Sequence, residues 1–472
     1  MIRQRSRFCR AMSLAVLFFF MGAELPVLPQ WGPSTAAAFS VGEEREVGEK
    51  LLALVRTQFK LIDDPDVSQY INHLGQEILK AAGPQYFDYH FFVIDNKEFN
   101  AFAAPSGLVF VHSGLIEAMS NEDELVGVMA HEIGHVTSRH IADQMAKGSK
   151  VGIGTAALIL AGILTGGGAL SQGLMAGGMA AGASMNLKFS REDEEQADRL
   201  AVRFMKKEGR DPHAMVSMLH KMRNLERYRP SIPPYLLTHP EPDLRLQYVQ
   251  DLLLHDKGPY PPRDDFDFQR IRYRIISRTQ EPMSLLPLLQ KEAAIGKEGS
   301  MAYYGLAQLY EATANFDKAE EALRKVMAAH PDRPILIADL GVLRFEAGRY
   351  GEALDLFRKA HAAMPDSAYA SFHLANTLMQ LGQLDEAGRI YERLLPELPD
   401  YSRLSYQLSR LRAAQGRPDE GYYYLGLYHW QEGEAEPAKQ YLNQAVARLP
   451  AGNELRKQAQ DLLKKIDRLS KV

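Results

Sequence analysis

The sequence predicts two parts of different fold class: a mostly helical α+β domain with a small sheet, followed by an all-α solenoid. In the first part, strand-like runs at residues 87–94, 100–104 and 108–112 lie between stretches with helical patterning. A linker rich in proline and charge follows at residues 255–265. Beyond it the chain repeats itself with a period of 34 residues. We therefore expect one domain at residues 39–257 and a second at 258–472.

The first 38 residues have the layout of a signal peptide. Arginines within the first ten residues precede an uncharged apolar core of 12 residues at 12–23, which is too short to span a membrane comfortably. Small residues at 36–38 offer a cleavage site before Phe39, although the long spacer ahead of them leaves an uncleaved anchor as an alternative. Cys9 is the only cysteine and lies in this segment, so the mature chain would have no thiol. We expect export to a bacterial periplasm.

Composition and net charge are those of an ordinary globular protein and do not point to nucleic-acid binding. The 472 residues are 46% hydrophobic and 24% charged, as in an ordinary globular protein. The net charge of −4 gives no argument for nucleic acid as a partner.

The first folded stretches are predicted helices at Glu43–Lys60 and around Val67–Ala82. A strand at Phe87–Ile94 and a hairpin that turns at Pro105-Ser106-Gly107 follow them.

The segment His131-Glu132-Ile133-Gly134-His135 lies in an apolar stretch with helical patterning. Residues four apart are about one turn apart, so both imidazoles project from one face. They can bind one Zn²⁺ and leave positions open. Glu132 lies beside the first ligand, where its carboxylate can accept a proton from water that the metal activates. Asn121 and Glu124 have the spacing of a capping box, and Gly134 lets another backbone come close. A chance match is the alternative to a zinc peptidase.

A site with two histidines needs a third protein ligand, and residues 190–201 offer one. Ser190 is the expected N-cap of a helix there. Glu194 and Asp198 lie four apart on one face of that helix. This spacing suits a ligand carboxylate followed by a carboxylate that orients a ligand histidine through its other ring nitrogen. An acidic first helical turn is usually only solvated, and three competing acids lack the pairing with Asp198: Glu192, Asp193 and Glu195.

Several motifs together resemble a known family. They are Asn100-Ala101-Phe102, Gly107 to Gly114, Glu122-Asp123-Glu124-Leu125, the H-E-I-G-H-V run with Arg139-His140, and the S-R-x-x-E-x-x-A-D run. Over most of residues 40–250 the chain resembles the zinc metallopeptidases that include the CAAX prenyl proteases and the bacterial heat-shock membrane protease. The resemblance implies a zincin-like metallopeptidase domain with one Zn²⁺ per chain. It implies His131, His135 and Glu194 as zinc ligands, Glu132 as general base and Asp198 as a residue behind the ligands.

The same resemblance extends to Thr238-His239-Pro240 and to Arg245, a further catalytic candidate. It implies that His239 lies near the metal. Two roles stay open there: a removable fourth ligand that blocks the site, or a group that contacts the tetrahedral intermediate. The alternative is a turn histidine that fixes only the backbone before a proline.

Asn100 and Phe102 are candidates for an edge strand that binds substrate. In zinc peptidases a strand upstream of the metal-binding helix commonly holds substrate by strand addition, which uses backbone hydrogen bonds and tolerates many sequences. A plain sheet edge is an equally good interpretation.

Residues 151–187 contain no charged residue and ten glycines. The apolar run at 151–164 ends at three consecutive glycines and is shorter than the roughly 20 residues of a membrane span. Three interpretations compete: a buried helical hairpin, a mobile flap over the active site, and a loop in peripheral contact with a membrane. The glycine content favours a mobile or membrane-contacting loop.

The second part has small residues, aromatic or leucine residues and prolines at 34-residue intervals. Four sets show it: Ala307, Gly341 and Ala375; Phe316, Tyr350 and Leu384; Ala319, Ala353 and Ala387; and Pro331, Pro365 and Pro399. This period is typical of tetratricopeptide repeats. Asp419–Gln431 is predicted to be a helix shared by two repeats, and Lys457–Val472 a polar capping helix.

Together these features predict an exported zinc-dependent endopeptidase that cleaves misfolded or stalled envelope proteins. Its substrates would be proteins or peptides, and its repeats would bind clients or partners. The resemblance and the leader imply envelope or outer-membrane assembly proteins as those partners. One alternative is a chaperone or assembly scaffold for outer-membrane proteins with a latent protease site. Another is a membrane-embedded protease.

Overall fold

The computed structural model describes residues 40–147, 188–228, 233–296 and 299–470. The predicted leader at 1–38 and the glycine-rich segment at 151–187 lie outside these ranges, so both remain predictions. No helix in the described ranges combines the length and the apolar character that a membrane crossing needs.

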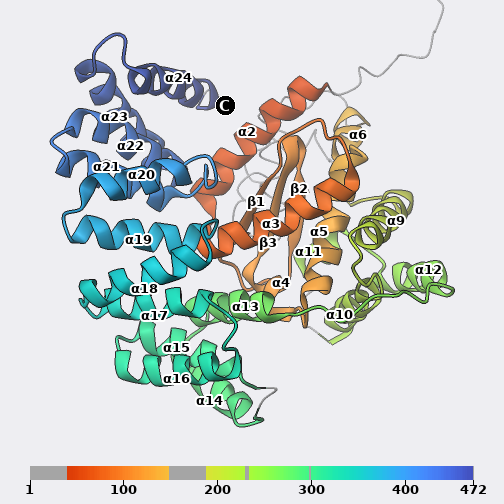
Figure 1. Cartoon of the computed structure of the whole chain (residues 1–472). Helices are drawn as coiled ribbons and strands as arrows, with labels where there is room; N and C mark the ends of the chain where they lie inside the picture. Colours follow the sequence, from red (N-terminus) through yellow and green to blue (C-terminus); the bar gives the residue numbers. More distant parts are fainter. Residues whose placement is uncertain (1–39, 148–187, 229–232, 297–298, 471–472) are drawn as a thin grey trace, which may run out of the picture. The chain divides into compact units, whose positions relative to one another are not determined.

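The first part of the chain is helical around a small sheet (Figure 1). Its elements in order are α2 (Val41–Gln58), α3 (Pro65–Ala82), β1 (His90–Ile94), β2 (Ala101–Ala104), the 3-10 turn η1 (Pro105–Gly107), β3 (Leu108–His112), α4 (Ser113–Ala118), α5 (Glu122–Thr137), α6 (His140–Lys147), α9 (Arg191–Lys207), α10 (Ala214–Tyr228), α11 (Pro234–Thr238) and α12 (Pro242–Leu253). The predicted helices at 43–60 and 67–82 are thus confirmed, with ends shifted by at most two residues.

The three strands form one sheet in the order β1-β3-β2. The predicted hairpin is confirmed, because β2 runs antiparallel to β3, and β1 runs parallel to β3. Both faces of the sheet are apolar. Successive side chains along each strand point to opposite faces, as a pleated strand requires. Phe91 and Val109 belong to a core cluster that also contains residues of α3 and α5. Phe92, Phe102 and Phe110 point to the other face, into a second cluster with residues of α2.

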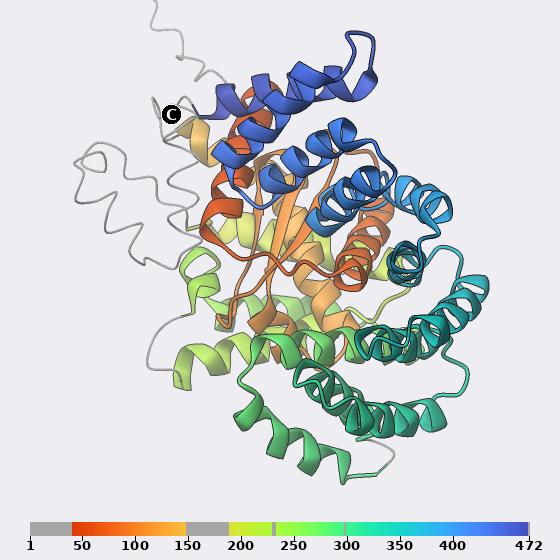
Figure 2. The same ribbon diagram turned by 90° about the vertical axis from the view of Figure 1, so that its left-hand side faces the viewer.

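The second part is a series of antiparallel helix pairs (Figure 2). Its elements are α13 (Phe266–Thr279), α14 (Pro282–Ala293), α15 (Ala302–Ala312), α16 (Phe316–Ala329), α17 (Ile335–Glu346), α18 (Tyr350–Ala363), α19 (Ala368–Gln380), α20 (Leu384–Leu394), α21 (Ser402–Ala414), α22 (Pro418–Gln431), α23 (Ala435–Arg448) and α24 (Glu454–Leu469).

The 34-residue period has a packing cause. Ala319, Ala353 and Ala387 occupy the same place on the second helix of successive pairs and are fully buried. Gly341 lies against the ring of Phe357, where a Cβ atom would come within 2.8 Å of the ring. Small residues therefore recur where two helices cross. The predicted shared helix is also found, since α22 packs against both α21 and α23.

Helix α13 joins the two parts through its side chains. Phe268, Ile271 and Ile275 belong to the core cluster of the first part. Phe266, Tyr273 and Ile276 belong to the cluster of the first repeats. The predicted boundary at 257/258 lies in the coil between α12 and α13 and stays a prediction.

A buried ionic cluster fixes α13 between α3 and α17. Arg274 donates to Asp64, the N-cap of α3, over 3.0 Å. Arg270 donates twice to Asp339 of α17, at 3.0 Å each. Asp339 also accepts hydrogen bonds from Tyr304 and Tyr369, at 3.1 and 3.0 Å. Because these charges are almost fully buried, removing one partner would leave another uncompensated at considerable cost.

Candidate metal centre

Helix α5 carries the two histidines and the glutamate of the H-E-x-x-H segment, all three at most 1% exposed. Asn121 caps the helix by accepting a hydrogen bond from the Glu124 backbone N–H. The predicted capping box is only half formed, which corrects the prediction. The Glu124 carboxylate accepts from the Ser120 N–H and pairs with Lys221 of α10 at 2.6 Å, so it turns toward α10 instead of Asn121.

Helix α9 supplies the carboxylates. Ser190 is its N-cap, as predicted, and forms a capping box with Asp193. Glu194 and Asp198 are 2% and 0% exposed. Gly134 of α5 lies so close to α9 that a Cβ atom there would be 3.1 Å from the Ala197 carbonyl oxygen. A side chain at position 134 would therefore crowd α9, the helix that carries Glu194.

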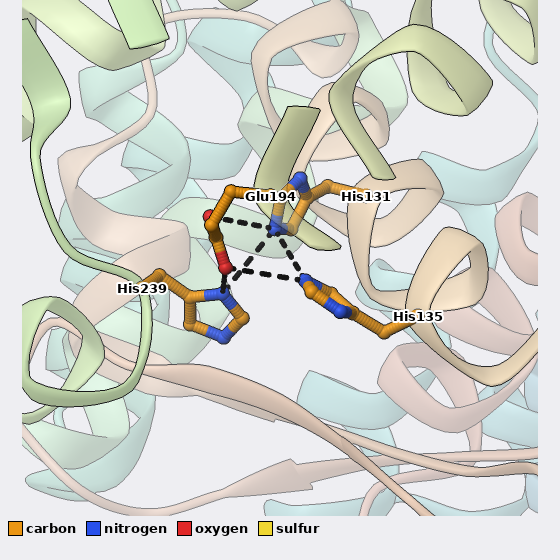
Figure 3. A group of neighbouring side chains, drawn as sticks. All are labelled: His131, His135, Glu194 and His239. Atoms are coloured by element: carbon orange, nitrogen blue, oxygen red, sulfur yellow. Dashed lines mark hydrogen bonds and ion pairs between the residues drawn. The ribbon is translucent and has the colours of Figure 1, made fainter. Parts of the chain in front are cut away.

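Four side chains converge on one point (Figure 3). His131 Nε2 lies 3.0 Å from His135 Nε2 and 3.3 Å from His239 Nδ1. Glu194 Oε1 lies 2.9 Å from His239 Nδ1 and 3.4 Å from His135 Nε2. The four ligand atoms all lie within 4.8 Å of one another. We call His131, His135, Glu194 and His239 the four-residue cluster. Among the described residues, no side chain of Glu192, Asp193 or Glu195 belongs to it.

The four-residue cluster fits a zinc ion in geometry and in charge. Ligand atoms about 2.0–2.1 Å from a tetrahedral ion lie about 3.3 Å from one another, close to the distances found here. In the buried site, the carboxylates of Glu132, Glu194 and Asp198 face a single guanidinium, that of Arg245. Carboxylates thus outnumber the guanidinium in the site, which favours the binding of a cation. Burial lowers the pKa of His135 well below its usual value, so its ring is neutral and can offer a lone pair.

Arg245 and Asp198 lie behind the cluster. Asp198 Oδ1 is 2.7 Å from His131 Nδ1. Arg245 of α12 donates to both Asp198 oxygens over 2.8 and 2.9 Å and lies 2.8 Å from Glu194 Oε2. Burial raises the pKa of Glu194, but Arg245 and two histidines outweigh it and hold this pKa well below its usual value. Tyr248 donates a further hydrogen bond to Asp198. Both carboxylates are thus held ionised and in fixed orientation.

Glu132 lies between the sheet and the cluster. Its Oε2 atom accepts a hydrogen bond of 2.9 Å from the backbone N–H of Ala103 in β2. Its buried Oε1 atom has no hydrogen-bond partner within the described ranges and lies 3.5 Å from His239 Nε2. One oxygen is therefore anchored to the sheet, and the other lies on the side of His239.

His239 follows α11 and is 1% exposed. Its ring stacks on that of Tyr235, with centroids 4.3 Å apart and an angle of 21° between the planes. Burial lowers the pKa of His239, but the carboxylates of Glu194 and Glu132 outweigh it and raise this pKa above its usual value. Packing on Tyr235 thus aims the ring at the cluster.

Strand β2 lies at the edge of the sheet. The His112 N–H donates to the Asn100 carbonyl, so by antiparallel alternation the backbone groups of Phe102 also face β3. Those of Ala101 and Ala103 face away from β3, where the Ala103 N–H meets Glu132, and both residues are buried. The side chains of Asn100 and Phe102 are buried, at 4% and 7% exposure. Their part in substrate binding stays a prediction.

Sequence reasoning missed three residues of this centre. Tyr248 has a weak signal, because it lies three residues after Arg245 on the same helix face. Tyr235 has none that we can name. His140 belongs to a motif of the resemblance but carried no role, since a residue five positions after His135 cannot share its helix face.

Comparison with known proteins agrees with this geometry. Residues 65–253 match peptidase family M48. Residues 304–365, 344–411 and 419–448 match tetratricopeptide repeats. The β-barrel assembly-enhancing protease of Yersinia pestis is 35% identical over 312 residues, which cover 65% of this chain and 64% of that protein.

Two more relatives extend the picture. The β-barrel assembly-enhancing protease of Escherichia coli K12 is 33% identical over 316 residues, covering 64% of this chain and 63% of its own length. The mitochondrial metalloendopeptidase OMA1 of Schizosaccharomyces pombe is 28% identical over 184 residues, covering 39% of this chain and 52% of that protein. The chain thus spans a little under two thirds of the bacterial relatives. Its first part is similar to the M48 peptidases, and its second part is similar to tetratricopeptide repeats.

Proposed function

We propose that the protein is a zinc-dependent endopeptidase that cleaves envelope proteins. The observation that carries this proposal is the convergence of the four-residue cluster beside Glu132. In the proposal, His131, His135 and Glu194 hold Zn²⁺, with Asp198 orienting His131. When bound, the ion would activate water and polarise the substrate carbonyl.

The protein's own groups do the rest. Glu132 accepts a proton from the attacking water through Oε1 and later delivers it to the leaving amine. Its other oxygen stays on the Ala103 N–H, which fixes the carboxylate in place. Substrate binds in extended form along the edge of β2 that faces away from β3. It uses the backbone of Ala101 and the Ala103 carbonyl, since the Ala103 N–H stays with Glu132. Arg245 acts from behind, by keeping Glu194 and Asp198 ionised.

Removal of the metal tests the proposal. The purified protein should contain about one zinc ion per chain and cleave casein or a denatured protein. A chelator should abolish cleavage, and added Zn²⁺ should restore it, because the ligands are deprotonated groups that rebind the ion. Elemental analysis and gel-based cleavage assays measure both. Cleavage at the full rate by protein shown to be free of metal would contradict the proposal.

We further propose that His239 keeps the resting site closed. Its Nδ1 atom occupies the place of a fourth ligand, 3.3 Å from His131 Nε2. A fourth protein ligand completes a tetrahedron and leaves no position for water. The cluster and Glu132 are also at most 2% exposed, as expected of a resting state.

His239→Ala should therefore raise basal cleavage several-fold while zinc stays bound through the other three ligands. The rate of casein cleavage at equal zinc content measures this. His255→Ala is the matched control, since His255 is an exposed histidine in the linker. A large fall in rate would instead make His239 a participant in catalysis, and no change would leave it with a structural role alone.

Location outside the cytoplasm is also a proposal. It rests on the composition of the first 38 residues. N-terminal sequencing of the protein from the envelope fraction should find a start near Phe39. Finding Met1 on the exported protein would favour an uncleaved anchor.

For partners, we propose envelope or outer-membrane assembly proteins that bind the repeats. Two relatives are named for enhancing β-barrel assembly, and tetratricopeptide repeats are surfaces for other proteins. The closed site also favours a second function, that of an assembly scaffold whose protease stays latent. Peripheral membrane contact through residues 151–187 stays a prediction.

A further inference from the structure

The imidazole of His140 lies directly behind His135. His140 is the first residue of α6 and is 4% exposed. Its Nδ1 atom is 2.8 Å from His135 Nδ1, the ring nitrogen that does not face the four-residue cluster. Its Nε2 atom is 3.1 Å from Oε1 of Gln196, on the same helix as Glu194. A line of three polar side chains therefore runs from the cluster to the surface of α9.

The chemistry of this line allows one arrangement of protons. His135 Nε2 faces the cluster, 3.0 Å from His131 Nε2, so its lone pair must point there to bind an ion. A neutral imidazole then carries its proton on Nδ1 and donates it to His140 Nδ1. His140 in turn must carry its own proton on Nε2. That N–H meets the Gln196 oxygen, with the Asp193 carboxylate also on this side at 3.7 Å.

We propose that His140 is a positioning residue of the metal centre, which fixes the tautomer and ring orientation of His135. The inference rests on the proposed zinc site. In this proposal, the two histidine ligands differ in the side chain that lies behind each of them. Asp198, a carboxylate, lies behind His131, whereas a neutral imidazole lies behind His135. His140 therefore contributes direction more than charge.

The backbone between the two histidines explains how His140 reaches this place. Helix α5 ends at Thr137, and Arg139 adopts a left-handed conformation with φ of 57°. Such a conformation costs about 1 kcal/mol or more in a residue other than glycine. The Arg139 Nε atom donates to Glu44 of α2 over 2.8 Å, and Glu44 is 3% exposed. This partly buried ion pair holds the turn that brings α6 back toward α5.

Two substitutions of His140 test the proposal. In asparagine, Oδ1 is bonded to Cγ as Nδ1 is in histidine, so His140→Asn can keep the acceptor that faces His135. His140→Leu fills the space without an acceptor. We expect His140→Leu to bind Zn²⁺ about 10–100-fold more weakly, as is typical when a partner behind a ligand is lost. His140→Asn should retain most of the affinity.

The readouts do not depend on cleavage. A chelating dye in competition gives the zinc affinity, and the visible absorption spectrum of the Co²⁺ form reports the ligand geometry. His140→Leu should change that spectrum, and His140→Asn should preserve it. Thermal unfolding of the metal-free variants checks that both fold. If His140→Leu does not fold, Gln196→Leu takes its place, because it removes the end of the line at an exposed position and should weaken zinc binding to a smaller degree.

The results separate this inference from the proposed function. Equal affinities and equal cobalt spectra for wild type and His140→Leu would overturn the role of His140 alone. Equal weakening by leucine and asparagine would also overturn it, because loss of packing would then explain the effect. If His140→Leu does not fold, unchanged affinity and spectrum in Gln196→Leu would do the same. A wild-type protein that binds neither Zn²⁺ nor Co²⁺ would refute the metal centre itself.

Discussion

Glu132→Gln should reduce peptide hydrolysis by about 10³-fold, the contribution typical of a general acid–base group, and leave the zinc content unchanged. Glutamine has nearly the shape of glutamate but cannot accept the proton. Its amide oxygen can still accept the hydrogen bond that the Ala103 N–H now gives to Glu132, so the local structure should persist. Glu132 does not belong to the four-residue cluster, which is why metal binding should survive. Steady-state cleavage and elemental analysis of the same preparation measure the two quantities.

Glu192→Gln is the control, because Glu192 is an exposed acid on the first turn of α9. In cells, Glu132→Gln separates the two proposed functions. Loss of the biological role in Glu132→Gln would assign it to the peptidase, and retention would assign it to the scaffold. Cleavage at the wild-type rate by the variant would remove Glu132 as the base.

Glu194→Gln should weaken zinc binding by more than 100-fold. Loss of a residue behind a ligand already costs about 10–100-fold in affinity, and Glu194 supplies both a ligand atom and a negative charge to a dication. The substitution also leaves Arg245 with Asp198 as its remaining carboxylate in the site, so some loss of stability should accompany the loss of metal. Competition with a chelating dye gives the affinity, and urea unfolding of the metal-free protein gives the stability.

Glu195→Gln is the matched control for this experiment. Glu195 is adjacent in sequence but pairs with Arg199 on the outer side of α9. Its variant should bind zinc as the wild type does. Full zinc occupancy in Glu194→Gln together with loss in Glu195→Gln would show that the ligand had been assigned to the wrong carboxylate.

The sequence predicted the parts of the centre that lie on single helices. The four-residue spacings of His131 to His135 and of Glu194 to Asp198 place each pair on one helix face, whatever the rest of the fold. Contacts between distant elements have no such local signal. The hydrogen bond from Ala103 to Glu132 depends on how the sheet packs on α5. The contact between His135 and His140 depends on one left-handed residue, Arg139.

The repeats were predictable for a related reason. Each pair of helices buries small residues at the same crossing. The sequence therefore shows the 34-residue period, for example at Ala319, Ala353 and Ala387. Helix α13 lies outside this period. Its apolar residues occupy most of its circumference, and periodicity alone cannot assign them to two separate partners.

Helix α13 contributes side chains to the cores of both parts, which limits how far the two parts can vary independently. Phe268, Ile271 and Ile275 come after residue 253, where the M48 match ends, yet they belong to the core of the first part. Each such side chain stabilises a core by about 1.5–3 kcal/mol, and an entire domain is stable by only about 5–15 kcal/mol. Gene fusion or recombination in the coil between α12 and α13 would therefore give a first part that lacks some residues of its own core. The first part therefore needs α13 to complete its core, and α13 in turn packs on the first repeats.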